Sequence, residues 1–264
     1  MHWLLDHPLI LMLATFALLW CATRGGAALR TRRGKLDDAS SSDFDIVLGA
    51  TLTLLGLIVG FSFSMSSSRY DQRKNLEEAE ANAIGTAYAR AALLPATDVA
   101  TVRTLLKDYA GLRVRFYAAA GLGYYSARDA QEQRELYRVT GRAQEQLWAK
   151  VVAAAAASAA PPPITALAVA ATNDAINAQG YAQAAVWNRI PTGSWALLYM
   201  LAIVAATMIG YRFHSAPPRP LLLMILPGVI SIAFCLIADI DCPRGGVIPV
   251  APQNLTALAE SLGN

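Results

Sequence analysis

Four runs of apolar residues interrupt an otherwise polar chain. They cover residues 8–22, 46–65, 195–211 and 221–238. The run at 46–65 contains no charged residue, and a helix of that length crosses a hydrocarbon core of about 30 Å. The run at 8–22 is shorter and spans a bilayer only if Trp3, Leu4 and Leu5 extend it. The pattern predicts four transmembrane helices.

Between the second and third apolar runs, residues 66–194 have the composition of helices. Alanine, leucine, glutamate, glutamine and arginine dominate, and β-branched residues seldom alternate with polar ones. Proline ends helices, so Pro95 and the proline triplet at 161–163 mark two boundaries. The predicted helices cover residues 66–94, 97–120, 127–160 and 164–189. The fold class is therefore all-α, a polytopic membrane protein with a helical extramembrane domain between its second and third spans.

We divide the chain into four parts and use their charges to orient it. Residues 1–65 hold two spans and a basic loop, 66–194 the extramembrane domain, 195–240 two further spans, and 241–264 a C-terminal tail. Four crossings place both termini and the domain on one side. The two short loops carry Arg24, Arg30, Arg32, Arg33, Lys35, Arg212 and Arg219, and the other side carries Arg69, Arg73, Lys74, Arg189 and Arg244 near the membrane. This excess favours cytoplasmic short loops.

Composition places the chain among membrane proteins and argues against several functions. Hydrophobic residues make up 55% of the 264 residues and charged residues 16%, with a mean hydropathy of +0.36. The 22 basic residues are interleaved with 19 acidic ones, unlike the basic face of a nucleic-acid-binding protein. The three cysteines and three histidines lack the spacing of a metal site or catalytic triad, and Gly25-Gly26 and Gly245-Gly246 lack the lysine of a phosphate loop. We expect no enzyme, cofactor, metal or nucleic-acid partner.

Small residues form one stripe along the second span. They recur at spacings of three and four residues: Gly49, Thr53, Gly56, Gly60, Ser64 and Ser67. Gly56 and Gly60 make a small-xxx-small pair, which lets two helices approach closely. The stripe has two interpretations, helix packing within one protomer or a subunit contact and the wall of a pore.

The polar end of the same span combines aromatic residues with hydroxyl groups. Phe61, Ser62, Phe63 and Met65 form a candidate constriction, with further serines at 64 and 66–68. Apolar rings can gate by excluding water, and hydroxyl donors can replace part of an anion's hydration shell. Serines also bond to their own helix backbone, so a structural role is the alternative.

Arg69 and Arg73 follow the span, one helical turn apart. In an oligomer they could form a basic ring that concentrates anions at a pore mouth. The alternative is that they pair with Glu77 and Glu78 at helical spacing on a solvated surface.

Asp239 and Asp241 end the fourth span, where an acid near the bilayer is costly unless it is paired or hydrated. A salt bridge to Arg244, or to Arg69 of a neighbouring helix, would stabilise these tail acids. Ion coordination is the alternative use of two carboxylates.

Six short segments carry a family resemblance. They are FSFSM at 61–65, RYD at 69–71, EANAIGTAY at 80–88, LLP at 93–95, NDAIN at 173–177 and DIDCPRG at 239–245. Together they resemble the bacterial bestrophin-like membrane proteins, a family of unknown function, over residues 44–262. A more distant analogy leads to bestrophin anion channels, pentamers whose subunits have four spans and whose second span lines the pore.

The resemblance implies a homo-oligomer in a bacterial inner membrane, a pentamer by analogy, that conducts inorganic ions such as chloride. It also implies the orientation opposite to the charge count, so the side of the extramembrane domain stays open. Bestrophins carry an acidic calcium clasp after their last span, whereas this chain has only Asp239 and Asp241 there. The resemblance therefore does not extend to calcium control.

Two functions are consistent with these patterns. The first is an oligomeric ion channel, anion-conducting, whose second span lines the pore. The second is a membrane-anchored sensor or scaffold whose helical domain binds a protein partner. The absence of charges in the four apolar runs favours passive conduction over a coupled carrier, which more often keeps an ionisable group within the membrane.

Overall fold

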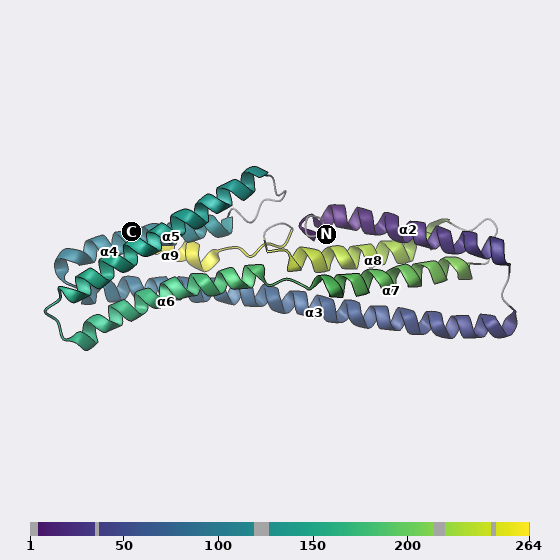
Figure 1. The fold of residues 1–264 in the computed structure, drawn as a ribbon, viewed down its shortest axis with the longest axis horizontal. Helices are drawn as coiled ribbons and strands as arrows, with labels where there is room; N and C mark the ends of the chain where they lie inside the picture. Colours follow the sequence, from purple (N-terminus) through teal and green to yellow (C-terminus); the bar gives the residue numbers. More distant parts are fainter. Residues whose placement is uncertain (1–4, 35–36, 119–126, 214–219, 244–246, 264) are drawn as a thin grey trace. The chain divides into compact units, whose positions relative to one another are not determined.

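A computed structural model describes residues 5–34, 37–118, 127–213, 220–243 and 247–263. Every regular element within these ranges is helical (Figure 1). The elements are α2 (Pro8–Arg33), α3 (Asp38–Arg90), the 3-10 helix η1 (Ala91–Leu93), α4 (Ala96–Ala118), α5 (Ala127–Ala156), α6 (Pro162–Trp187), α7 (Thr192–Arg212), α8 (Pro220–Asp241) and α9 (Gln253–Gly263). Contacts group them into a membrane unit, Met1–Ser68 with Arg189–Cys242, and an extramembrane unit, Arg69–Asn188 with Pro243–Asn264.

The membrane unit contains α2, α7, α8 and the first part of α3. Within the described residues, four helical stretches are long and apolar enough to cross a bilayer, and they include the four predicted runs. The predicted fold class, an all-α membrane protein with four transmembrane helices, is therefore confirmed.

Helix α2 extends beyond the predicted first span. It continues to Arg33 through the segment that the sequence pattern indicated as a basic loop, so that part of the prediction is wrong. Alanine, leucine and arginine in this segment are good helix formers, and the helix ends at Arg33, followed by Gly34 as its C-cap, whose φ of 86° suits glycine. The extension is used in packing, because Arg30 Nη1 donates to the Tyr211 carbonyl oxygen near the end of α7 at 2.9 Å.

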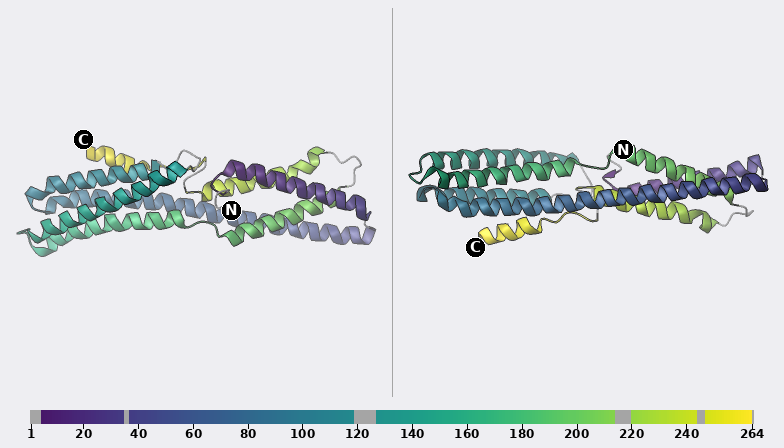
Figure 2. Two further views of the ribbon diagram at one scale, coloured as in Figure 1. Left: turned by 45° about the horizontal axis from the view of Figure 1, so that its top comes forward. Right: turned by 90° about the horizontal axis from the view of Figure 1, so that it is seen from below.

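Two glycines allow α2 and α7 to cross with their backbones in contact. A Cβ atom added at Gly26 would overlap the carbonyl oxygen of Thr207, and one added at Gly210 would overlap the carbonyl oxygen of Thr23. Figures 1 and 2 show α2, α7 and α8 side by side within the membrane unit. The crossing is an intramolecular version of the small-residue helix contact that membrane proteins use widely.

An aromatic cluster joins α7 to α8. Trp195 and Phe234 are fully buried, with ring centroids 6.0 Å apart and planes at 83°. Tyr199 meets Phe234 at 5.1 Å in the same edge-to-face manner. Such pairs stabilise beyond their buried area, so the first turns of α7 are well anchored.

The extramembrane unit packs η1, α4, α5, α6 and α9 with the last part of α3. The predicted helix boundaries hold to within a few residues, since α4 starts directly after Pro95 and α6 starts at Pro162. Proline in the first turn lacks only an N–H that would be unpaired anyway, which explains why α6 begins before residue 164. Leu106, Leu147 and Ala175 are fully buried in the core of this unit.

The C-terminal segment belongs to the same unit. The sequence division treated residues 241–264 as a tail, whereas α9 lies against α4 and Leu255 is fully buried in the core. Leu258, one turn further, packs against the same core. An amphipathic helix thus completes the unit.

Candidate functional site

Helix α3 presents one face to its own protomer. Leu55, Ser62 and Ser66 are buried, and Leu55 joins the apolar core of the membrane unit. The Ser66 hydroxyl donates to the Ile237 carbonyl oxygen of α8 at 3.3 Å. These three residues lie within about 40° of one another around the helix, so a single narrow face packs inward.

The predicted stripe of small residues lies on the opposite face. Its members, Gly49, Thr53, Gly56, Gly60, Ser64 and Ser67, are exposed, apart from Ser67, which is half-buried. A Cβ atom added at Gly49, Gly56 or Gly60 would meet no atom of the described protomer within 4 Å. The Thr53 hydroxyl bonds to the carbonyl oxygen of Gly49, 2.9 Å away. Packing within the protomer therefore does not account for these three glycines.

The candidate constriction does not form one surface. Ser62 is buried with 4% exposure, whereas Phe61 is 61% and Phe63 41% exposed. Residues two apart on a helix are about 160° apart around it, so Phe61 and Phe63 point to different sides. Phe63 lies about 60° from the centre of the stripe and Met65 about 140° from it. Only Phe63 of the four flanks the stripe closely.

The predicted basic pair is also divided. Arg73 is buried with 4% exposure in the extramembrane unit, whereas Arg69 is half-buried. Both side chains take part in interactions within the chain. The buried face of α3 continues through position 73, so Arg73 is not on the surface. The protomer therefore does not present both arginines to an exposed ring.

A buried ion pair joins α3 to α4 in the extramembrane unit. Arg113 donates to both carboxylate oxygens of Glu80, and neither side chain is exposed. The Tyr117 hydroxyl donates to the same carboxylate at 3.4 Å, and the Arg113 guanidinium lies 4.3 Å from the centre of the Phe116 ring. Sequence reasoning missed this cluster, although Glu80 opens one of the segments that carry the family resemblance.

Burial raises the pKa of two neighbouring phenols. Burial, and then the negative charge of Glu80, raise the pKa of Tyr109 to about 12. The same two causes raise the pKa of Tyr117. Both hydroxyls therefore stay protonated at neutral pH, and Tyr109 accepts a hydrogen bond from Gln144 Nε2 at 3.1 Å.

A second buried carboxylate on α3 holds the C-terminal helix. Glu77 is 1% exposed and accepts hydrogen bonds from Asn254 Nδ2 at 2.7 Å and from the backbone N–H of Leu255 at 2.8 Å. The carboxylate thus caps the first turn of α9, where a negative charge is favourable. Glu77 therefore caps α9 from a buried position and does not lie on a solvated surface, as the alternative interpretation of its pairing with Arg69 and Arg73 required.

The tail acids close one end of the membrane unit. Asp241 accepts the backbone N–H of Ile190 with both oxygens at 3.1 Å and lies 3.7 Å from Arg189 Nε. Arg189 also donates to Asp6 at 2.6 Å. The predicted partners of Asp241 were Arg244, which lies outside the described residues, and Arg69. The structure adds Arg189, which folding brings to Asp241 from the segment before α7.

Asp239, the other tail acid, is buried with 4% exposure and takes part in interactions of its own. Across the described residues, no three His, Cys, Asp or Glu side chains converge in a way that could hold a metal ion. The contacts that the structure gives for Asp241 are structural ones, to the Ile190 backbone and to Arg189.

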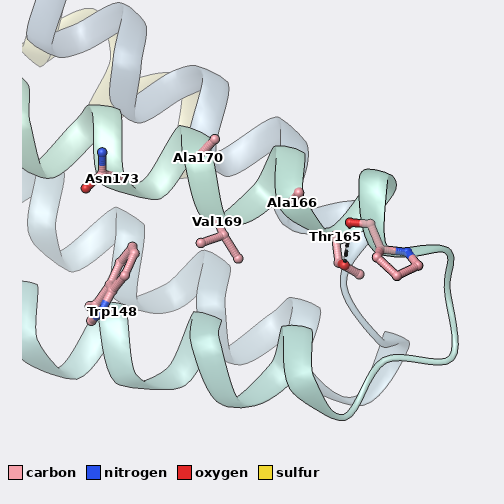
Figure 3. A pocket seen from close by; sticks show the side chains of 7 residues that line it. Trp148, Thr165, Ala166, Val169, Ala170 and Asn173 are labelled. Atoms are coloured by element: carbon pink, nitrogen blue, oxygen red, sulfur yellow. Dashed lines mark hydrogen bonds between the residues drawn. The ribbon is translucent and has the colours of Figure 1, made fainter.

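The extramembrane unit also carries a shallow apolar groove of about 470 Å³. Trp148 of α5 points toward Val169 of α6 across it, and Asn173 lies at one end (Figure 3). Thr165 at the other end bonds to the Pro162 carbonyl oxygen at 3.2 Å. The groove has no charged lining residue, so it offers no obvious chemistry.

A family assignment follows from residues 11–255, which match the Bestrophin-like domain. The chain belongs to the Bestrophin-like family. This confirms the resemblance drawn from the six sequence segments. No curated protein matches the chain at a significant level.

Solved structures agree with this assignment at the level of the fold. The chain is similar to a bacterial bestrophin homologue from Klebsiella pneumoniae. One variant of that protein has a TM-score of 0.66 at 13% identity, covering 96% of this chain and 97% of the other. A second variant has a TM-score of 0.64 at 14% identity, covering 97% of each chain. The fold of this bestrophin-like protein is therefore shared across almost its full length.

Proposed function

We propose that the protein is a homo-oligomeric ion channel of the bacterial inner membrane, with the second span, residues 46–65 of α3, lining the pore. Membership of the Bestrophin-like family supports conduction in general. The observation that carries the pore assignment is the exposure of the small stripe. Gly49, Gly56 and Gly60 have no neighbour within the described protomer, although an apolar helix gains from close packing.

Oligomerisation follows from the size of the protomer. Four spans do not enclose an aqueous path of their own, so in this proposal α3 meets copies of itself in a ring of five subunits, by analogy with bestrophins. Around a symmetry axis, small residues let the helices approach while their backbones stay near the path.

Anions are the proposed substrate, chloride among them. The stripe presents the hydroxyls of Ser64 and Ser67 and no carboxylate, so it has donors for an anion and no fixed charge that binds a cation. Phe63 beside the stripe is the proposed apolar gate. Of the two basic residues predicted at the mouth, Arg69 is the one with exposed surface.

Planar bilayer recording tests this proposal. Purified oligomers between solutions of unequal potassium chloride concentration should show unitary currents that reverse near the chloride equilibrium potential. Reversal near the potassium potential would overturn the anion assignment and keep the channel. The mass of the detergent-solubilised complex, measured on the same sample, gives the subunit number.

The second candidate, a membrane-anchored scaffold, draws on the groove between α5 and α6 (Figure 3). An uncharged groove beside an exposed tryptophan is the kind of surface that binds a partner helix. Well-folded oligomers that carry no current in chloride or potassium would favour this function over conduction.

A further inference from the structure

One face of α2 is exposed along most of the helix. It carries Leu13, which is 65% exposed, followed by Ala17, Cys21, Arg24 and Arg32. At about 100° per residue, these five positions lie within about 100° of one another around the helix. An exposed leucine of a membrane-spanning helix contacts acyl chains, which are as apolar as its own side chain. The same face therefore brings two arginines to the lipid.

Arg24 lies near the edge of the hydrocarbon core. A Cβ atom added at Gly210 would overlap the carbonyl oxygen of Thr23, so Arg24 is level with the last turn of α7. Counted from Pro8, the first residue of α2, Arg24 is about 24 Å along the helix axis, whereas the hydrocarbon core is about 30 Å thick. A charge inside hydrocarbon is costly, so this guanidinium needs the headgroup layer or a charged partner.

The described protomer gives these arginines no acidic partner. Helix α2 contains no Asp or Glu between Pro8 and Arg33, and neither Arg24 nor Arg32 forms an ion pair with a described residue. The Arg24 guanidinium lies 5.7 Å from the centre of the Trp20 ring. A cation–π contact leaves the N–H groups of the guanidinium free to donate hydrogen bonds.

Acids at the start of α3 do not cancel this charge. Residues 24–45 and 212–219 together hold seven basic residues and four acids. Of those acids, Asp37 accepts the backbone N–H of Ser40, and Asp45 pairs with Arg212. The net charge of these segments is therefore positive.

Ala28 separates the two arginines on one ridge of α2. Positions four apart are neighbours on a helix, so Arg24, Ala28 and Arg32 form a row, and all three are exposed. The row is about 12 Å long. The small side chain of Ala28 leaves open surface between two long side chains, and the fork of N–H donors on each guanidinium matches phosphate oxygens.

We propose that each protomer binds one anionic phospholipid at this row. The phosphate lies over Ala28 between Arg24 and Arg32, and the acyl chains follow the apolar face at Leu13 and Ala17. The phosphate supplies the negative charge that α2 lacks, and the apolar face gives a lipid a contact that free phosphate cannot use. Orientation of a span needs only the number of basic residues, whereas this site needs the two arginines at this spacing.

Native mass spectrometry of the full-length protein tests the site. With phosphatidylglycerol and phosphatidylcholine of identical chains in competition, we expect one phosphatidylglycerol to be retained per protomer. Ala28→Glu should abolish this preference, because the new carboxylate pairs with both arginines and repels the phosphate. Ala28→Gln, which has the same size without the charge, is the matched control and should keep the preference.

Single arginine substitutions separate a site from a general effect of charge. Arg24→Gln and Arg32→Gln should each weaken phosphatidylglycerol binding about tenfold, as for the loss of a charge-assisted hydrogen bond. Arg134→Gln, at an exposed position of α5, makes the same change in net charge and should have no effect. Equal weakening by all three variants, or equal retention of the two lipids by the unaltered protein, would overturn the site. Displacement of the lipid by millimolar inorganic phosphate would overturn the assignment of a lipid as its ligand.

Discussion

Two glycine-bearing helix faces in the membrane unit have opposite surroundings. At the crossing of α2 and α7, Gly26 and Gly210 touch the backbone of the facing helix. On α3, Gly56 and Gly60 have the four-residue spacing that favours close contact between helices. A Cβ atom added at either glycine would nevertheless meet no described atom of the protomer within 4 Å. The first face packs against a helix of the same protomer. On the second face an added Cβ atom would meet no described atom of the protomer, which is why we propose that this face serves assembly and the pore.

The largest expected effect is at the crossing. Gly26→Ala should destabilise the protomer by about 3 kcal/mol, at the upper end for overpacking, because the added methyl meets backbone atoms that cannot rotate away. Thermal unfolding in detergent, followed by circular dichroism, measures the loss. Gly25→Ala is the matched control, since a Cβ atom there meets nothing within 4 Å. Equal stability of the two variants would mean that the helices do not cross at Gly26.

Gly56→Leu should leave the protomer intact and disrupt the oligomer. Its unfolding free energy should change by no more than about 0.5 kcal/mol, as for other open surface positions. The mass of the solubilised complex should fall toward that of one chain. Ala50→Leu, on the exposed surface about 80° around the helix from the centre of the stripe, is the control that should keep the oligomer. If both variants assemble normally, the stripe is not a subunit contact.

Phe63→Ala should change conduction and Phe61→Ala should not. The two rings are both exposed, but only Phe63 lies beside the stripe. Removing an apolar ring from a narrow path lowers the dewetting barrier, so the open fraction in bilayer recordings should rise. The reverse result, with Phe61 controlling the current, would show that a different face of α3 meets the axis.

The smallest overall effect is expected at Gly85, where the space for an added Cβ atom is intermediate between the overlap at Gly26 and the open surface at Gly56. A Cβ atom there would come 3.3 Å from the Leu258 Cδ1 atom, the tip of a flexible side chain on α9. Gly85→Ala should therefore change stability by less than about 1 kcal/mol. Hydrogen exchange at residues 253–263 is the direct measurement. Complete loss of hydrogen-exchange protection in α9 would contradict this, because it would mean that Leu258 yields to the added methyl no more easily than the backbone at the α2–α7 crossing.

Some of these features were predictable from local patterns, because a continuous apolar run determines a span wherever it lies. The run at 46–65, the boundary at Pro95 and the family segments all predicted what was found. The extension of α2 was missed because its arginines suggested a loop, although arginine is a good helix former.

The candidate site was predicted less well, because it depends on which way each side chain points. Phe61, Ser62 and Phe63 are neighbours in sequence, yet the helix sends them to different sides. The sequence offered Arg244 and Arg69 as partners for Asp241 and did not indicate Arg189, which is far away in the chain. Nothing in the sequence marked Gly26 and Gly210 as partners.

The sequence by itself determined the class of this protein: four apolar helices, a polar helical domain and a bestrophin-like family. These follow from properties that each segment carries alone, namely hydropathy, helix propensity and short motifs. Only the tertiary structure decided which glycines pack against a neighbouring helix of the protomer, which face of α3 remains open, and that Arg189 meets Asp241. Those outcomes depend on contacts between segments far apart in the chain, and no local pattern contains them.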